Sequence, residues 1–258
     1  MTIKKKLLLA TDVHNQVICS NILKRLIPLK KAGLESIILF QRGNLDFEID
    51  ALAGSGIECT VVRDNIFSSS RIFSIADKED IPFIIVHFQG NKKKKSLYNS
   101  TIRNLIDETT RPLMLINGLN NTVNTGEEGF FHHMILAENW SISSKKAFDF
   151  ILDYKDAIKE LEIVNVISKK LTIREMRTIK DRMMKSRKVC LDEKIDAESH
   201  IYAGKISKEI LTSAKDYKAT GIVMGRSSQK GIINRFFKES LPYEAAIEST
   251  LPVIVVPS

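Results

Sequence analysis

Short apolar runs alternate with amphipathic segments along the chain. The runs are uninterrupted rather than alternating, which is typical of strands covered on both faces, as in a parallel sheet flanked by helices. Regular alternation of strand and helix indicates βαβ units with right-handed crossovers. The predicted strands of the first half are residues 7–10, 37–40, 60–62, 83–86 and 113–116.

The same pattern starts again after a polar stretch. Residues 117–129 (NGLNNTVNTGEEG) contain little to bury and are predicted to form a linker. Strands are predicted after it at 133–137, at 163–167, within 189–203, at 221–225 and at 253–256. Helices are predicted at 141–159, near 171–186, at 206–214 and at 241–249, the first of them with Ala147, Ile151, Tyr154 and Ile158 on one face.

The two halves repeat one order of elements, and their ends match best. Residues 110–116 (TRPLMLI) correspond to 250–256 (TLPVIVV), and 8–12 (LLATD) correspond to 135–139 (ILAEN). The repeat indicates a duplicated α/β domain, with domains at 1–117 and 131–258 and a linker at 118–130.

Composition narrows the possible classes of protein. The chain has 258 residues and a net charge of +8, but its Lys and Arg residues are dispersed, so we expect a solvated surface rather than a nucleic-acid site. No apolar run approaches the roughly 20 residues that cross a membrane. Neither a CxxC motif nor a signal-peptide pattern is present, so a cytoplasmic location is expected. Cys19 and Cys190 are predicted to be buried small hydrophobes.

The second half resembles a universal stress protein domain. The resemblance rests on residues 221–225 (GIVMG), the following loop 226–231 (RSSQKG) and the closing strand 251–256 (LPVIVV). Residues 135–147 resemble the opening strand and serine-started helix of the family, and the first half follows the same order more weakly. The resemblance implies a tandem member, with a five-stranded parallel sheet and helices on both faces in each half, of the HUP-like nucleotide-binding type.

The resemblance also implies an adenine nucleotide site in the second half. Many family members bind ATP through a loop of the form G-x2-G-x9-G-[ST], in which glycines let backbone N–H groups approach phosphate oxygens. Gly225 keeps the first glycine, Ser228 replaces the second, and Ser240 keeps the final hydroxyl. Asn139 stands where the family has a ribose-binding Asp, and Val166 stands at the adenine-contact position.

This motif is damaged. Glu239 takes the place of the third glycine and would repel a triphosphate, whereas Arg226 belongs to a group of cations near the loop that would neutralise one. We therefore expect weak or vestigial binding of ATP or another adenine nucleotide, with or without magnesium, or no ligand. The other cations of the group are Lys230, Arg235 and Lys238.

The first half departs from the motif differently. Asp12 keeps the acidic residue, but His87 replaces the first glycine and Phe40 replaces the small aliphatic residue beside adenine. Gly90 stands for the second glycine, and residues 92–95 place four lysines in the loop. Specific ATP binding is not favoured in this half.

Other chemistry is not indicated. The sequence contains no nucleophile elbow, zincin motif or P-loop, so neither catalytic residues nor a metal site is expected. His132 and His133 precede a predicted strand and point to opposite faces, and both are expected at the surface or in the linker. Trp140 either caps the ligand crevice or packs over the loop.

Three classes of function remain open. The favoured one is a non-catalytic regulatory or stress-response protein of the universal stress type. The alternatives are a nucleotide-dependent enzyme, through slow ATP hydrolysis or adenylyl transfer, and a protein-interaction module without a ligand. Residues 113–116 and 253–256 are expected to pair, either within one chain as a pseudo-dimer or across a homodimer, because pairing hides apolar edges; the protein partner is unknown, and no membrane partner is expected.

Overall fold

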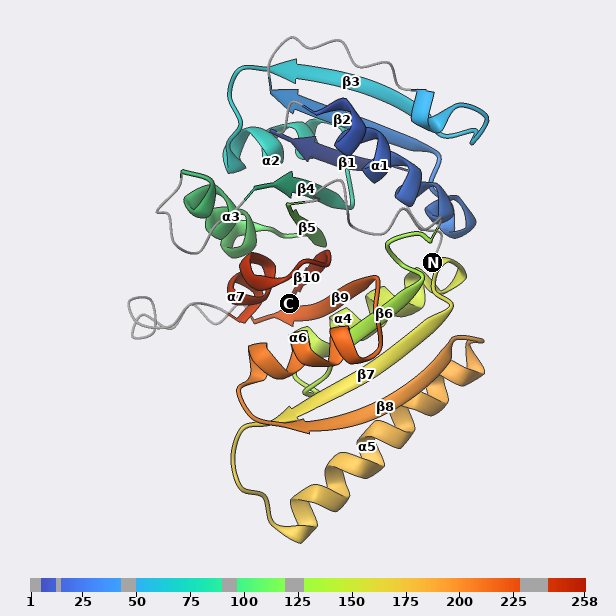
Figure 1. Ribbon diagram of the computed structural model, residues 1–258, viewed down its shortest axis with the longest axis vertical. Coiled ribbons are helices and arrows are strands. Elements are labelled where there is room, and N and C mark those ends of the chain that lie inside the picture. Colours follow the sequence, from blue (N-terminus) through green and yellow to red (C-terminus); the bar gives the residue numbers. More distant parts are fainter. Residues whose placement is uncertain (1–5, 13–14, 43–49, 90–96, 119–127, 228–240) are drawn as a thin grey trace.

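One continuous sheet forms the centre of the molecule (Figure 1). The computed structural model describes residues 6–12, 15–42, 50–89, 97–118, 128–227 and 241–258. Within these ranges ten strands follow the order β3-β2-β1-β4-β5-β10-β9-β6-β7-β8. The strands are β1 Lys6–Thr11, β2 Ser36–Arg42, β3 Glu58–Asp64, β4 Ile84–Phe88, β5 Leu113–Asn117, β6 His133–Ala137, β7 Glu160–Ile167, β8 Asp196–Ala203, β9 Gly221–Arg226 and β10 Val253–Pro257.

Helices cover both faces of this sheet. The buried strand positions alternate between two cores: Leu7 and Leu9 face α1, while Leu8 and Ala10 face α2 and α3. The inner strands are thus covered on both sides, which explains their uninterrupted apolar runs and confirms the predicted fold class, whereas the edge strands β3 and β8 are only partly buried. The helices are α1 Gln16–Leu26, α2 Ser69–Lys78, α3 Leu97–Glu108, α4 Ile142–Asp153, α5 Ile173–Asp192, α6 Ile206–Asp216 and α7 Leu241–Glu248, with 3-10 turns η1 Ile27–Ala32, η2 Asp50–Leu52 and η3 Lys155–Ala157.

The two halves join along β5 and β10. All strand pairs within a half are parallel, whereas β10 pairs antiparallel with β5, with Ile254 opposite Met114. Of the two pairings expected for the closing strands, within one chain or across a homodimer, the structure contains the one within the chain. Asn117 adds a side-chain bond across this seam, donating from Nδ2 to the carbonyl of Ile247 in α7 at 2.9 Å.

An aromatic cluster closes the seam at the other end of the strands. Phe83 of the first half packs edge-on against Phe131 and Phe150, and Tyr154 stacks on Phe131 with ring centroids 5.3 Å apart. Arg25 lies over the ring of Phe130 at 4.0 Å and accepts the Phe130 N–H with its carbonyl. Phe130, the last residue of the predicted linker, and Phe131 after it are thus part of the core.

Two predicted helix ends are wrong. The helix predicted at 141–159 ends at Asp153, because Tyr154 turns into the aromatic cluster and Ile158 is extended (φ −103°, ψ 123°) ahead of β7. Ile158 is buried from a strand entry rather than from a helix face. The basic helix predicted near 171–186 continues to Asp192, after a start fixed by a capping box between Thr172 and Glu175.

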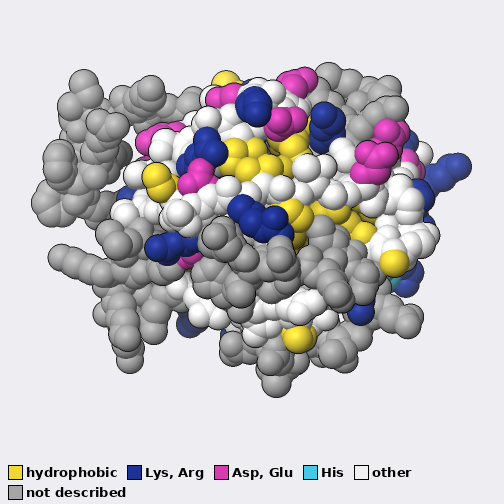
Figure 2. Space-filling model, turned by 90° about the horizontal axis from the view of Figure 1, so that it is seen from above, with side chains coloured by type: hydrophobic (Ala, Val, Ile, Leu, Met, Phe, Trp, Pro, Cys, Tyr) yellow, Lys and Arg dark blue, Asp and Glu magenta, His cyan; other side chains and the backbone are white. Residues whose placement is uncertain are grey.

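The buried thiols agree with the prediction for the cysteines, and the charges of one face are mixed in sign. On the face shown in Figure 2, the described Lys and Arg side chains lie among Asp and Glu side chains. Cys19 and Cys190 are buried, as predicted, and burial raises the pKa of the two thiols to about 11 and about 12. None of the helices in the described ranges is both long and apolar enough to cross a bilayer.

Candidate functional site

Each half has a topological switch point at the carboxyl ends of its central strands. In the second half β6 lies between β7 and β9, and in the first half β1 lies between β2 and β4. The strand order reverses at β6 and at β1, and parallel α/β sheets bind ligands outside the carboxyl ends of strands at such points. Asn139, Val166 and Gly225 lie at this edge of the second half, and Asp12 and His87 lie at this edge of the first.

Gly225 is held by close packing against α4. A Cβ built on this residue would lie 2.3 Å from the carbonyl carbon and oxygen of Ser143 and 2.6 Å from the backbone nitrogen of Ser144. No real Cβ makes such contacts, so only glycine lets the first turn of α4 approach β9 this closely. The retained glycine of the predicted nucleotide loop therefore has a packing role of its own.

Polar side-chain atoms at this edge form hydrogen bonds with the first residues of α4. The Oδ1 atom of Asn139 accepts from the N–H of Ser141, the N-cap residue, at 3.0 Å. Glu138, which the sequence analysis did not single out, is buried and accepts from the N–H of Trp140 at 2.6 Å and from the hydroxyl of Ser144. A charged residue directly after an apolar strand was the available signal for Glu138.

Trp140 turns its ring toward α5. Its φ of +57° is left-handed, and the ring packs against the core that α4 and α5 cover, with the Arg182 guanidinium 5.5 Å from the ring centroid. The buried Nε1 atom has no hydrogen-bond partner among the described residues. The side chain is therefore packed mainly as part of the core.

Arg226 points across the seam rather than along the crevice. Its Nη2 atom donates to the carbonyl of Thr109 at 2.7 Å and its Nη1 atom donates to the carbonyl of Asp107 at 3.2 Å. Burial lowers the pKa of this guanidinium, and the nearby Asp107 carboxylate opposes the shift. A cation at the end of α3 stabilises the free carbonyls there. Arg226 thus joins the halves in this structure.

The remaining predicted residues of the second half divide into two groups. Val166 is half-buried near the carboxyl end of β7, beside Tyr202 of β8, and packs on the core that α6 and α7 cover. Ser228 and Ser240, and with them Glu239, lie outside the described residues.

The first half has two buried polar atoms without partners at the same edge. The Asp12 side chain is 3% exposed; its Oδ1 atom lies 3.4 Å from Nη1 of Arg42, and its Oδ2 atom has no partner among the described residues. His87 is fully buried, with Nδ1 3.1 Å from the Thr11 hydroxyl and Nε2 similarly unpartnered. Burial lowers the pKa of His87 to about 4, so its ring is neutral at pH 7.

Two aromatic rings pack together at β2, the strand beside β1 in the first half. Phe40 is fully buried on β2, and the ring of Phe67 stacks on it with centroids 5.9 Å apart and planes parallel. Phe40 stands where the resemblance places the adenine contact, so an apolar stack lies at this position.

His133 corrects one prediction. It was expected at the surface, but as the first residue of β6 it lies mostly buried opposite Glu160 of β7, with Nε2 2.9 Å from Oε1 of Glu162. The register of the two parallel strands makes these contacts, and local sequence does not show it. His132 is more exposed and lies 4.0 Å from the Glu128 carboxylate.

Comparison with known proteins gives the fold. No protein-family model matches the sequence, and no protein of curated function does. Among solved structures, a universal stress protein from Archaeoglobus fulgidus DSM 4304 aligns with a TM-score of 0.70 and 20% identity over 99% of both chains. A protein of unknown function from Pseudomonas aeruginosa PAO1 aligns with a TM-score of 0.64 and 14% identity over 99% of this chain and 93% of the other. Both alignments span the two halves, so the fold that the resemblance implied is confirmed at full length.

Proposed function

We propose that this chain, which has the tandem universal stress protein fold, is a non-catalytic regulatory protein of a stress response that binds an adenine nucleotide weakly in its second half. One observation carries the nucleotide part of the proposal. Asn139, Val166 and Gly225 lie at or just beyond the carboxyl ends of β6, β7 and β9, around the point where the strand order reverses. Crevices at such points bind nucleotides in α/β sheets.

We expect nucleotide binding to be weak because side-chain atoms at this edge already form hydrogen bonds within the protein. The Oδ1 atom of Asn139 caps α4 through Ser141, and an amide lacks the charge that strengthens a bond to a ribose hydroxyl. Arg226 is engaged with the end of α3. A nucleotide bound here acts as a ligand that shifts conformation or partner affinity, which requires different affinities for the two states.

A regulatory role is proposed in preference to an enzymatic one because the sequence contains no nucleophile elbow, zincin motif or P-loop. Glu138, the buried carboxylate at this edge, accepts hydrogen bonds from Trp140 and Ser144 on one oxygen, Oε1, which ties it to the start of α4. The proposal therefore includes no hydrolysis or adenylyl transfer.

Calorimetry and thermal-shift titrations with ATP, ADP and AMP, with and without magnesium, test the proposal. A ligand at about 100 times its Kd adds about 2.7 kcal/mol to the free energy of unfolding. The informative variant is Asn139→Asp, which keeps the acceptor for Ser141 and adds a charge. We expect its nucleotide affinity to rise by about three- to tenfold, because charge-assisted bonds are stronger.

Asp12→Asn in the first half is the matched control, and its nucleotide affinity should equal that of the wild type. Absence of binding at millimolar nucleotide in both the wild type and Asn139→Asp would contradict the proposal and leave a protein-interaction module without a ligand. Steady release of ADP or AMP by the purified protein would instead contradict the non-catalytic part.

A further inference from the structure

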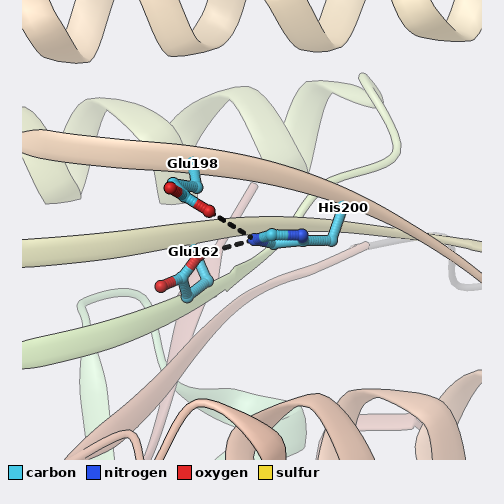
Figure 3. Close-up of side chains that lie close together, drawn as sticks. All are labelled: Glu162, Glu198 and His200. Atoms are coloured by element: carbon cyan, nitrogen blue, oxygen red, sulfur yellow. Dashed lines mark hydrogen bonds and ion pairs between the residues drawn. The ribbon is translucent and has the colours of Figure 1, made fainter.

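A cluster of carboxylate and imidazole groups lies on the sheet face that α6 covers (Figure 3). Glu162 of β7 and Glu198 of β8 are register partners, and His200 lies two residues after Glu198. Side chains two residues apart in a strand share a face, so the three converge, as Figure 3 shows. The cluster lies on one face of the strands, whereas the crevice lies at their carboxyl ends.

The three donor atoms are spaced for one metal ion. Nε2 of His200 lies 2.7 Å from Oε2 of Glu162 and 3.8 Å from Oε2 of Glu198, and all three atoms are within 4.8 Å of one another. Ligand atoms of a tetrahedral zinc ion, with bonds of about 2.0–2.1 Å, are about 3.3 Å apart. The two distances from His200 would therefore change by about half an ångström to reach zinc-binding separations, and the distance between the two carboxylates by at most about 1.5 Å.

Neighbouring side chains orient two of the donors. His133 lies 2.9 Å from the other oxygen of Glu162, through Nε2. The Tyr217 hydroxyl lies 3.0 Å from Nδ1 of His200, and the two rings stack with centroids 4.4 Å apart. Metal-binding carboxylates and imidazoles are commonly fixed by such partners, which hold ring orientation and tautomer.

Charge balance also favours a cation. The Glu162 side chain is only 9% exposed, and the ion-pair partners recorded for it among the described residues are the imidazoles of His133 and His200. An imidazole offsets this charge only when it is protonated, whereas a bound metal ion offsets it directly, and buried charges are normally paired or bound to metal.

We propose that Glu162, Glu198 and His200 bind a zinc ion. An imidazole nitrogen among carboxylates suits zinc better than magnesium or calcium, which prefer oxygen ligands. When Nε2 of His200 ligates, the ring proton sits on Nδ1 and is donated to the Tyr217 hydroxyl, which fixes the tautomer. Glu198 is 66% exposed, and the site therefore opens to solvent with room for a water as fourth ligand.

Calorimetry with zinc chloride on untagged, chelator-treated, full-length protein tests this site. We expect one zinc per chain and a rise in Tm that magnesium and calcium do not produce. His200→Gln and Glu198→Gln should each weaken zinc binding at least tenfold, because each removes a ligand. Asp196→Asn, at an exposed position on the same face of β8, is the matched control and should bind zinc as the wild type does.

Cobalt supplies an independent spectroscopic readout. Visible d–d absorption that is lost in Glu198→Gln, without a thiolate charge-transfer band, would support ligation by this cluster rather than by a cysteine. Glu198 is exposed, so this variant keeps the test valid should His200→Gln fail to fold. The proposal is overturned by the absence of stoichiometric zinc binding, or by unchanged affinity in folded His200→Gln and Glu198→Gln. The titrations contain no nucleotide, so their outcome is separate from that of the proposed nucleotide site.

Discussion

The two halves place different residues at one position of the shared strand order, His87 on β4 and Gly225 on β9. In the first half the fully buried imidazole of His87 has one ring nitrogen without a partner among the described residues, and the buried side chain of Asp12 lies at the same edge. In the second half the backbone of Ser143 lies against the glycine, closer than any side chain would permit. The edge of the first half therefore buries an ionisable pair of side chains, whereas the edge of the second half is defined by a close backbone contact.

This difference shows that a retained motif residue can be kept for packing alone. Gly225 matches the first glycine of a nucleotide loop, yet the contact with Ser143 would require glycine even without a ligand. Conversely, Asp12 keeps the acidic residue of the motif in the half where His87 and Phe40 replace its neighbours. Binding therefore has to be tested at residues whose change leaves the packing intact.

The largest effect is expected from Gly225→Val. Its side chain would collide with backbone atoms of α4, and we expect a loss of about 3 kcal/mol or more in the free energy of unfolding, at the upper end for overpacking. Urea denaturation of the full chain measures it. Ser143→Gly should not rescue the variant, because the clash is with main-chain atoms; rescue would show that the Ser143 side chain was responsible.

The pH dependence of stability tests whether the imidazole of His87 in the first half is buried and neutral. Burial lowers the pKa of His87 from 6.5 to about 4, so the unfolded chain binds more protons between these values and stability falls as the pH falls through this window. The stability that depends on a neutral His87 is fully present above pH 6.5, and about 3 kcal/mol of the free energy of unfolding is lost by pH 4. In His87→Gln this part of the slope in denaturation free energy should disappear. An identical slope in the two proteins would show that His87 titrates normally.

A smaller effect is expected from Arg226→Ala. The variant loses two charge-assisted bonds to the end of α3, and because the guanidinium is only partly buried we expect a cost of about 1–2 kcal/mol in chemical denaturation. Nucleotide affinity should stay unchanged, since the side chain points away from the crevice. A large loss of affinity with little loss of stability would assign Arg226 to phosphate binding after all. Arg226→Lys replaces the forked guanidinium with a single ammonium group. Its free energy of unfolding should therefore lie between those of the wild type and Arg226→Ala.

The sequence predicted the elements whose determinants are local. The strand predicted at 133–137 is β6 with the same bounds, since an apolar run between polar residues fixes both ends. The pairing of residues 113–116 with 253–256 was also predictable, because each run is an apolar edge that needs cover. Ile158 misled the helix prediction, because helix periodicity and strand burial both favour an apolar residue there.

The missed features depend on contacts between distant segments. Arg226 meets Asp107 and Thr109 across the seam, and Gly225 meets Ser143 of another element. Local pattern does not show either contact. For the proposed zinc site a signal was present: Asp196, Glu198 and His200 alternate along one strand, which places them on one face. The predicted strand range of 189–203 was too wide to show it.

The antiparallel seam of β5 and β10 has a consequence for how this chain is able to diverge. In a symmetric homodimer every substitution appears twice about the axis, so both copies of an interface must tolerate it. Here a covalent connection keeps the halves at high effective concentration, and the seam need not be self-complementary. Arg226 illustrates this, because the corresponding strand position in the first half is Phe88, a buried aromatic residue. Substitutions in one half therefore need not be matched in the other. One half is able to specialise as the pairing partner while the residues at the strand ends of the other half change, and the ten-stranded sheet is kept.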